Sequence, residues 1–179
     1  HGLLFLRGFA RCRRQPRRFG RRRPSGGNDN GASVSAMQVC VLVANGVFDT
    51  GLASVLDTLQ TATELTPPTK AASAFRVSVC AVRQRVTTQQ GLRVPLVPLP
   101  RVRPDVVVLP ALGAKSADAL AAALALREVA DLGQLLSEWS RAGTLVAAAG
   151  TGSFVLAEAG LLEGRTATTR RRLGPWFRQ

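Results

Sequence analysis

The sequence predicts an α/β fold in which a mostly parallel β-sheet carries helices on both faces. Four short runs of apolar, largely β-branched residues alternate with segments of helical periodicity, which is the order of βαβ units. Hydrophobic residues make up 46% of the 179 residues, enough for the core of one ordinary domain. No segment holds the ~18 uninterrupted apolar residues that a membrane-spanning helix needs, so we expect no membrane partner.

The first βα unit begins at residue 38. Gln38–Ala44 (QVCVLVA) is continuously apolar after its first residue, as in a strand that is buried on both faces. The turn Asn45-Gly46 follows, and Asp49 or Thr50 is positioned to cap the next helix. The apolar stripe of that helix consists of Leu52, Val55, Leu56 and Leu59. The Pro-rich segment 66–69 ends it.

Two further strands are expected in the middle of the chain. Phe75–Val82 (FRVSVCAV) alternates like a strand, and Asp105–Leu109 (DVVVL) reads as a buried strand that Pro110 ends. The segment Val86–Val97 between them has Gln90-Gly91 at its centre. It is either a hairpin or a short excursion along the sheet edge.

The last βα unit supplies most of the functional information. Ser116 opens a helical region that reaches about Arg141, with Gly133 as a candidate break within it. Thr144–Ala149 (TLVAAA) is the fourth strand, and it runs through the small residues 150–153 into a helix over Phe154–Ala159. Gly160 suits the position just after a helix end.

In parallel α/β sheets, ligands bind beyond the carboxyl ends of the strands, where segments 45–50, 110–114 and 150–153 should converge. A buried strand, a tight turn of small residues and a helix start form the layout of a nucleophile elbow. Such a turn presents one side chain, surrounded by backbone N–H groups that favour an anion or a polarised carbonyl.

The net charge of +13 resides in the two ends of the chain. Residues 1–36 hold nine arginines and one acidic residue, residues 170–179 hold four arginines, and residues 37–169 are nearly neutral. We expect a disordered Arg-rich leader over 1–36, a globular domain over 37–169 and a basic tail over 170–179. The leader is either an arm that neutralises nucleic-acid phosphates, or sequence upstream of a natural start at Met37.

Cysteine and histidine usage argues against a metal site and against a bound cofactor. Cys12, Cys40 and Cys80 are far apart without C-x-x-C spacing, and the single histidine is His1. A Cys/His zinc site is therefore not expected. Cys40 and Cys80 lie inside apolar runs and are interpreted as small core residues.

After the elbow the chain continues as LAEAGLLEGR over 156–165, followed by Ala-Thr-Thr over 167–169. This string and its leading strand resemble the ThiJ/PfpI family of the class I glutamine amidotransferase-like superfamily. More narrowly, residues 38–170 resemble the amino-terminal domain of GlxA-type AraC-family transcription regulators. The resemblance implies a flavodoxin-like three-layer sandwich and a cytoplasmic protein that can form a homodimer. It also implies a DNA-binding helix-turn-helix domain, before which this chain is truncated.

Two departures from the family pattern bear on catalysis. The family has cysteine at the elbow, where this chain has Gly150, and it follows Ala-Thr-Thr with His and Trp, where this chain has Arg170 and Arg171. A thiolate nucleophile needs its sulfur and a group to position or ionise it, so we predict no catalytic residue. Asp49 resembles the family's acidic position near the first strand, although it is equally well interpreted as a helix cap.

The sequence therefore favours a non-catalytic, small-molecule-sensing domain of a transcription regulator, with an unknown ligand. The predicted ligand-binding residues are Asp49, Ala111, Leu112, Gly150, Thr151 and Gly152. One alternative is an amidase-like or isonitrile hydratase-like enzyme, with an oxyanion hole formed by the backbone of Thr151 and of Ala111 or Leu112. Others are nucleic-acid binding through the Arg-rich ends, and a fragment or pseudogene-like product that folds poorly.

Overall fold

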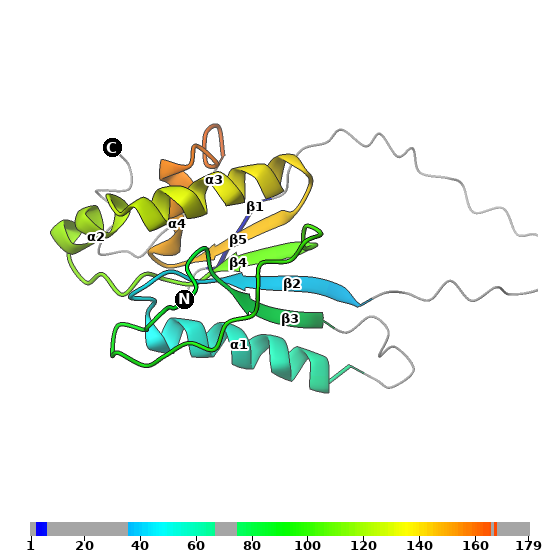
Figure 1. Ribbon diagram of the computed structural model, residues 1–179. Helices are drawn as coiled ribbons and strands as arrows, with labels where there is room; N and C mark the ends of the chain where they lie inside the picture. Colours follow the sequence, from blue (N-terminus) through cyan, green and yellow to red (C-terminus); the bar gives the residue numbers. More distant parts are fainter. Residues whose placement is uncertain (1–2, 7–35, 67–74, 166, 168–179) are drawn as a thin grey trace, which may run out of the picture.

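The computed structural model describes residues 3–6, 36–66, 75–165 and 167, and its centre is one five-stranded sheet (Figure 1). The strands lie in the spatial order β1-β5-β4-β2-β3. Their bounds are β1 Leu3–Leu6, β2 Met37–Leu42, β3 Phe75–Cys80, β4 Val106–Leu109 and β5 Leu145–Ala149. The last four are parallel to one another, and β1 pairs antiparallel with β5 at the edge. The predicted mostly parallel sheet is confirmed.

Helices cover both faces of the sheet, which makes the fold a three-layer sandwich. The helices are α1 Asp49–Glu64, α2 Ala117–Leu124, α3 Arg127–Arg141 and α4 Gly152–Glu158. Figure 1 shows α1 on one face and α2, α3 and α4 on the other. Right-handed crossovers between parallel strands place consecutive helices in this way.

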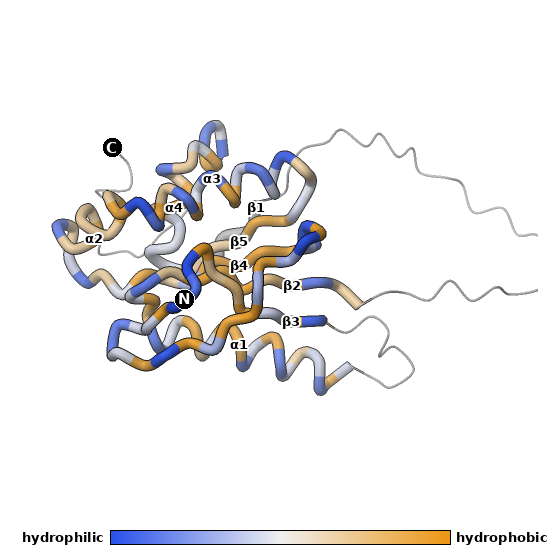
Figure 2. Tube along the Cα trace, viewed as in Figure 1, coloured by the Kyte–Doolittle hydropathy of each residue, from blue (hydrophilic) through white to orange (hydrophobic). Residues whose placement is uncertain are grey.

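The core follows from the two-residue period of the strands. On β2, Val39 and Val41 pack with the apolar stripe of α1, whereas Cys40 and Leu42 belong to the cluster that includes the inner residues of α3. All four side chains are buried. Figure 2 shows the most hydrophobic stretches along the central strands and mixed polarity along α1, which has one face in water.

Each of the four strands expected from residue 38 onward is present, displaced by no more than two residues at either end. Segment 86–97 is a hairpin in its first part and runs along the sheet edge in its second part. An antiparallel bridge joins Thr87 to Arg93 around Gly91, which has a φ of +83°, so this part is a tight hairpin. Farther on, the Val97 N–H donates to the Val79 carbonyl oxygen over 2.9 Å and covers the open edge of β3.

Two expectations about helix ends and breaks are wrong. The helical region after Ser116 divides between Leu124 and Arg127, and Gly133 lies inside α3. A Cβ on Gly133 would lie 3.3 Å from the Cβ of Ala159, so this glycine serves the close packing of α3 against the end of α4. Ser116 opens α2 as expected, and it caps the helix: its Oγ accepts from the Ala119 N–H over 3.2 Å.

The start of α1 also differs from the expectation. Phe48 is the residue before the helix and makes no side-chain cap, so Asp49 and Thr50 are its first two residues. The Asp49 carboxylate accepts instead from the Gln90 N–H, over 3.3 Å. The helix begins one residue earlier than the polar pattern suggests, and this frees Asp49 from the capping role.

Within the expected leader, Leu3–Leu6 form β1. The physical reason is the open edge of β5, whose backbone groups need partners that an apolar run can supply. Residues 7–35 and 168–179 lie outside the described part of the chain, and with them most of the leader and all of the basic tail. Among the described helices, none has the length and apolar character required to cross a membrane.

Candidate functional site

The three segments expected to meet beyond the carboxyl ends of the strands do meet. The Phe48 N–H donates to the Ala111 carbonyl oxygen over 2.8 Å, and the Gly113 N–H donates to the Gly46 carbonyl oxygen over 2.8 Å. The Thr151 Oγ1 then donates to the Leu112 carbonyl oxygen, also over 2.8 Å. These bonds join the ends of β2, β4 and β5 into one layer of loops.

The elbow after β5 has the backbone geometry that its layout predicts. Gly150 has a φ of +53°, in the left-handed region that side chains disfavour. A Cβ on Gly152 would lie 2.8 Å from the Leu109 carbonyl oxygen and 2.9 Å from that of Pro110. The turn therefore needs glycine at position 152, because the backbone of the β4 end passes directly against it.

Two hydroxyl groups flank the elbow, and both already have partners. The Ser153 Oγ donates to the Gly150 carbonyl oxygen over 2.8 Å, and the Thr151 hydroxyl donates to Leu112 as described above. Both residues are buried. A hydroxyl nucleophile needs a base to take its proton, and these hydroxyls are held on backbone carbonyls instead.

Asp49 supplies an acidic side chain at the same end of the sheet. Its Oδ2 accepts from the Gln90 N–H, whereas its Oδ1 is buried and has no hydrogen-bond partner among the described residues. A carboxylate oxygen that lacks a donor is unfavourable unless a ligand or water supplies one. Asp49 is therefore a candidate to accept a hydrogen bond from a guest molecule.

Sequence reasoning missed Glu128, the best-buried charged side chain near these loops. It is 7% exposed, and its two carboxylate oxygens accept from the Asn45 N–H over 3.2 Å and from the Asn45 Nδ2 over 3.1 Å. The Asn45 Oδ1 in turn accepts from the Thr87 N–H over 3.2 Å. The only sequence signal was an acidic residue at a helix start; its partner lies 83 residues away and could not be inferred.

The two described cysteines are core residues, as predicted. Cys40 and Cys80 lie on neighbouring strands, are fully buried and are not joined by a disulfide. The hydrogen bond with Cys80, together with burial, raises the pKa of the Cys40 thiol. Neither residue belongs to the three segments that meet beyond the strand ends, so neither places a thiol at the elbow.

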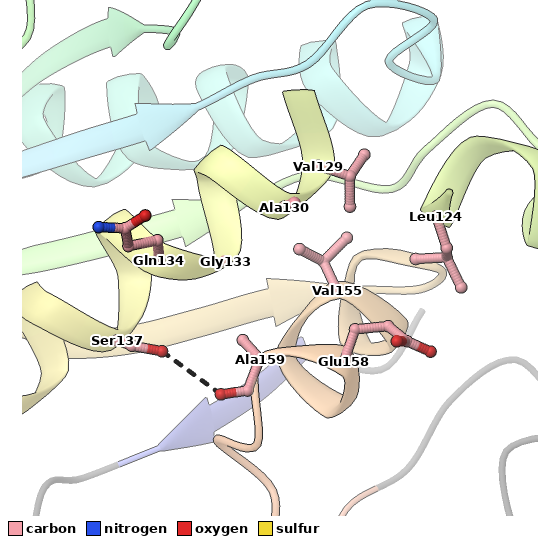
Figure 3. A pocket seen from close by; sticks show the side chains of 9 residues that line it. All are labelled: Leu124, Val129, Ala130, Gly133, Gln134, Ser137, Val155, Glu158 and Ala159. Atoms are coloured by element: carbon pink, nitrogen blue, oxygen red, sulfur yellow. Dashed lines mark hydrogen bonds between the residues drawn. The ribbon is translucent and has the colours of Figure 1, made fainter. Parts of the chain in front are cut away.

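A pocket of about 360 Å³ lies elsewhere, between α2, α3 and α4 (Figure 3). Val129 and Val155 contribute to its apolar wall, and the Ser137 Oγ donates to the Ala159 carbonyl oxygen over 3.3 Å at one side. Its full lining is Leu124, Val129, Ala130, Gly133, Gln134, Ser137, Val155, Glu158 and Ala159. None of the six predicted ligand-binding residues is among them, so a ligand cavity at the strand ends stays a prediction. Within the described ranges, no group of three or more His, Cys, Asp or Glu residues could hold a metal ion.

No protein-family model matches the chain, and no curated protein matches it. Solved structures do match. An AraC-family transcriptional regulator from Pseudomonas putida is 17% identical, with a TM-score of 0.61 over 78% of this chain and 70% of that one. A proposed transcriptional regulator from Vibrio parahaemolyticus is 21% identical, with a TM-score of 0.59 over 79% and 71%.

A third match is a two-domain protein from Anabaena variabilis with DJ-1/ThiJ/PfpI-like and ferritin-like domains. It is 20% identical, with a TM-score of 0.55 over 79% of this chain and 37% of that one. Likeness at these identities shows the fold, which is the flavodoxin-like sandwich that the resemblance to ThiJ/PfpI proteins and AraC-family regulators predicted.

Proposed function

We propose that this domain senses a small molecule as part of a GlxA-type, AraC-family transcription regulator, and that it binds its ligand without transforming it. The observation that carries the proposal is the elbow. Gly150 stands in the left-handed turn after β5, where the family has its cysteine, so the position offers no reactive atom.

Among the described residues, no side chain close to the elbow is suited to the role of nucleophile. Acyl transfer needs a nucleophile whose proton passes to a base. The hydroxyls of Thr151 and Ser153 donate hydrogen bonds to backbone carbonyl oxygens. The thiols of Cys40 and Cys80 are buried in the core. The chain has one histidine, His1, which lies outside the described residues.

Two features of the strand ends support ligand binding. Asp49 offers an unpartnered carboxylate oxygen, and the loops around it are cross-linked by backbone hydrogen bonds, which favours a preformed site. A ligand that carries an N–H or O–H donor would suit this oxygen. The solved AraC-family regulator has the same fold, which supports a regulatory output delivered through a partner domain.

Thermal unfolding with a panel of the twenty amino acids, small amides and small carboxylates tests the proposal. A compound at 100 times its Kd stabilises the folded state by about 2.7 kcal/mol, which raises Tm by roughly 8 °C in a domain of this size. We expect Asp49→Asn to lose this shift, because the amide presents only one acceptor oxygen and no charge. Asp57→Asn, an exposed change on the same helix, is the matched control and should keep it.

Steady turnover by the purified chain in amidase, isonitrile hydratase or glyoxalase assays would contradict the proposal. So would a panel in which every compound that stabilises the wild type stabilises Asp49→Asn equally. An enzyme of the ThiJ/PfpI type remains the second candidate, because the left-handed turn that presents a nucleophile in such enzymes is retained at Gly150.

A further inference from the structure

We propose that β1 is an exchangeable strand, so that Leu3–Leu6 of one copy pairs with β5 of a second copy and joins the two chains into a dimer. This inference is independent of ligand sensing. It rests on two observations: the pairing of β1 with β5, and the length of the segment that links β1 to β2.

Within the sheet, β1 pairs with one strand, β5. Its four residues pair antiparallel with Val146–Ala149, from Leu3 opposite Ala149 to Leu6 opposite Val146. Figure 1 shows β1 at the outer side of β5. The other four strands form a continuous parallel sheet of their own, through the β4–β5, β2–β4 and β2–β3 ladders. β1 can therefore leave without breaking any pairing among the remaining strands.

The segment that links β1 to β2 has many more residues than the distance between the two strands requires. Because β1 is antiparallel to β5, Leu6 lies at the amino-terminal end of the parallel strands, where Met37 begins β2. Three strand spacings separate β1 from β2, or about 14 Å. An extended chain crosses that distance in about five residues. Thirty residues, 7–36, make the connection.

This excess length weakens the preference for pairing within one chain. The probability of loop closure falls with about the three-halves power of loop length, so thirty residues close about 15-fold less readily than five. On a tether of this length, β1 has an effective concentration near the millimolar range at the β5 edge of its own chain. A second copy at comparable concentration can therefore supply the strand.

The second copy is the occupant that fits the β5 edge. It carries the same Leu3–Leu6 segment, so the exchanged pairing repeats the register already present, which is how strand exchange builds dimers at little cost. An edge that loses its partner exposes unpaired N–H and C=O groups, which favours recapture of a strand. The β4–β5 ladder holds β5 from its other side, so β5 stays in the sheet when β1 departs.

Disulfide trapping in full-length chains tests the proposal. In a Cys12→Ser background, Phe5→Cys and Ala147→Cys place thiols at opposite positions of the ladder, as do Leu4→Cys and Ala148→Cys. Two pairs are needed because neighbouring antiparallel pairs alternate between the longer and the shorter Cα separation. Cys40 and Cys80 are buried and should not interfere.

The two single-cysteine chains of a pair are mixed, one with an affinity tag so that the mixed dimer is recognised by its mass. We expect the mixed disulfide dimer to rise at least fivefold between about 10 μM and 1 mM chain, as competition at a millimolar effective concentration requires. The control pair, Phe5→Cys with Ala149→Cys, is two residues out of register. Ala149 is more exposed than Ala147, so random collision would favour the control.

If a Phe5 or Ala147 variant folds poorly, the second register pair, Leu4→Cys with Ala148→Cys, keeps the result decisive. A double variant, Phe5→Cys with Ala147→Cys in one chain, adds a second measurement. A disulfide within the chain at low concentration that gives way to disulfides between chains at high concentration supports exchange. Disulfides confined to single chains at every concentration, or register pairs that form no more mixed dimer than the control, would overturn the proposal.

Discussion

Gly150 is the residue on which the functional interpretation depends. Its φ of +53° is the conformation that a nucleophile elbow imposes, and glycine adopts it without strain. The turn therefore keeps the shape of a catalytic element while lacking a side chain. A turn of this shape with glycine at its apex fits the proposed site, which binds a molecule and leaves it unchanged.

Restoring a thiol at this position should give a reactive cysteine without hydrolase activity. In a Cys12→Ser background, we expect Gly150→Cys to take up one equivalent of iodoacetamide in the native state, whereas Cys40 and Cys80 react only after denaturation because both are fully buried. Peptide mapping by mass spectrometry measures this. No histidine lies in the described part of the chain, so amidase turnover should stay at background.

Gly164→Cys is the matched control for this experiment. Gly164 also has a positive φ, of +66°, but it is exposed and lies outside the elbow. It therefore carries the same backbone strain with ordinary thiol access. Amide hydrolysis by Gly150→Cys but not by Gly164→Cys would show that the site still has the remaining catalytic machinery, and would favour the enzyme.

Glu128 and Asn45 form a partly buried polar contact between the loop after β2 and α3: the Glu128 side chain is buried, whereas Asn45 is exposed. We expect Glu128→Gln to lower the free energy of unfolding by about 1–3 kcal/mol, because an amide offers one acceptor oxygen where two donors of Asn45 must be satisfied. Urea denaturation measures the change. Glu138→Gln is the control. The Glu138 side chain is exposed and accepts a hydrogen bond from the Gln134 side chain. Its substitution should change the free energy of unfolding by less than about 0.5 kcal/mol. Equal effects of the two substitutions would mean that the Asn45 contact is not structural.

At the scale of elements, the elbow depends on how closely its helix approaches the end of β4. Gly152→Ala should destabilise the fold by about 2 kcal/mol or more, because the added Cβ would meet the carbonyl oxygens of Leu109 and Pro110 below 3 Å. Gly91→Ala is the comparison. It has a φ of +83° with open space around it, so it should cost only about 1 kcal/mol of backbone strain. Thermal unfolding of both variants should rank them in this order, and the reverse order would contradict the close approach.

The strands were predictable because each is a short apolar run with a turn signal after it, as Gln38–Ala44 and Asp105–Leu109 illustrate. The convergence of their carboxyl ends followed from parallel topology alone. Helix boundaries were less predictable: the break between α2 and α3 falls at Ala125-Leu126, which carry no breaker signal, whereas Gly133 is retained for packing. The Glu128–Asn45 contact could not be foreseen, because pairing across 83 residues is a tertiary property.

At the scale of the whole molecule, β1 changes the interpretation of the chain's first residues. Leu3–Leu6 continue the sheet by one strand. Each hydrogen bond between β1 and β5 contributes little to the free energy of unfolding, since a typical backbone hydrogen bond adds about 0.5–1.5 kcal/mol. Their larger effect is to cover the β5 edge.

Removal of residues 1–36 should therefore leave a folded domain with an exposed edge. We expect the chain that begins at Met37 to keep its circular dichroism spectrum, because its four parallel strands remain paired, but to lose several degrees of Tm and to associate as concentration rises. Light scattering from about 10 μM to 1 mM measures the association. Replacing Leu4 and Phe5 by proline in the full chain is the control, since proline removes backbone donors and blocks the ladder while the arginines stay. If both variants keep the wild-type stability and associate as the wild type does, β1 contributes nothing to the sheet.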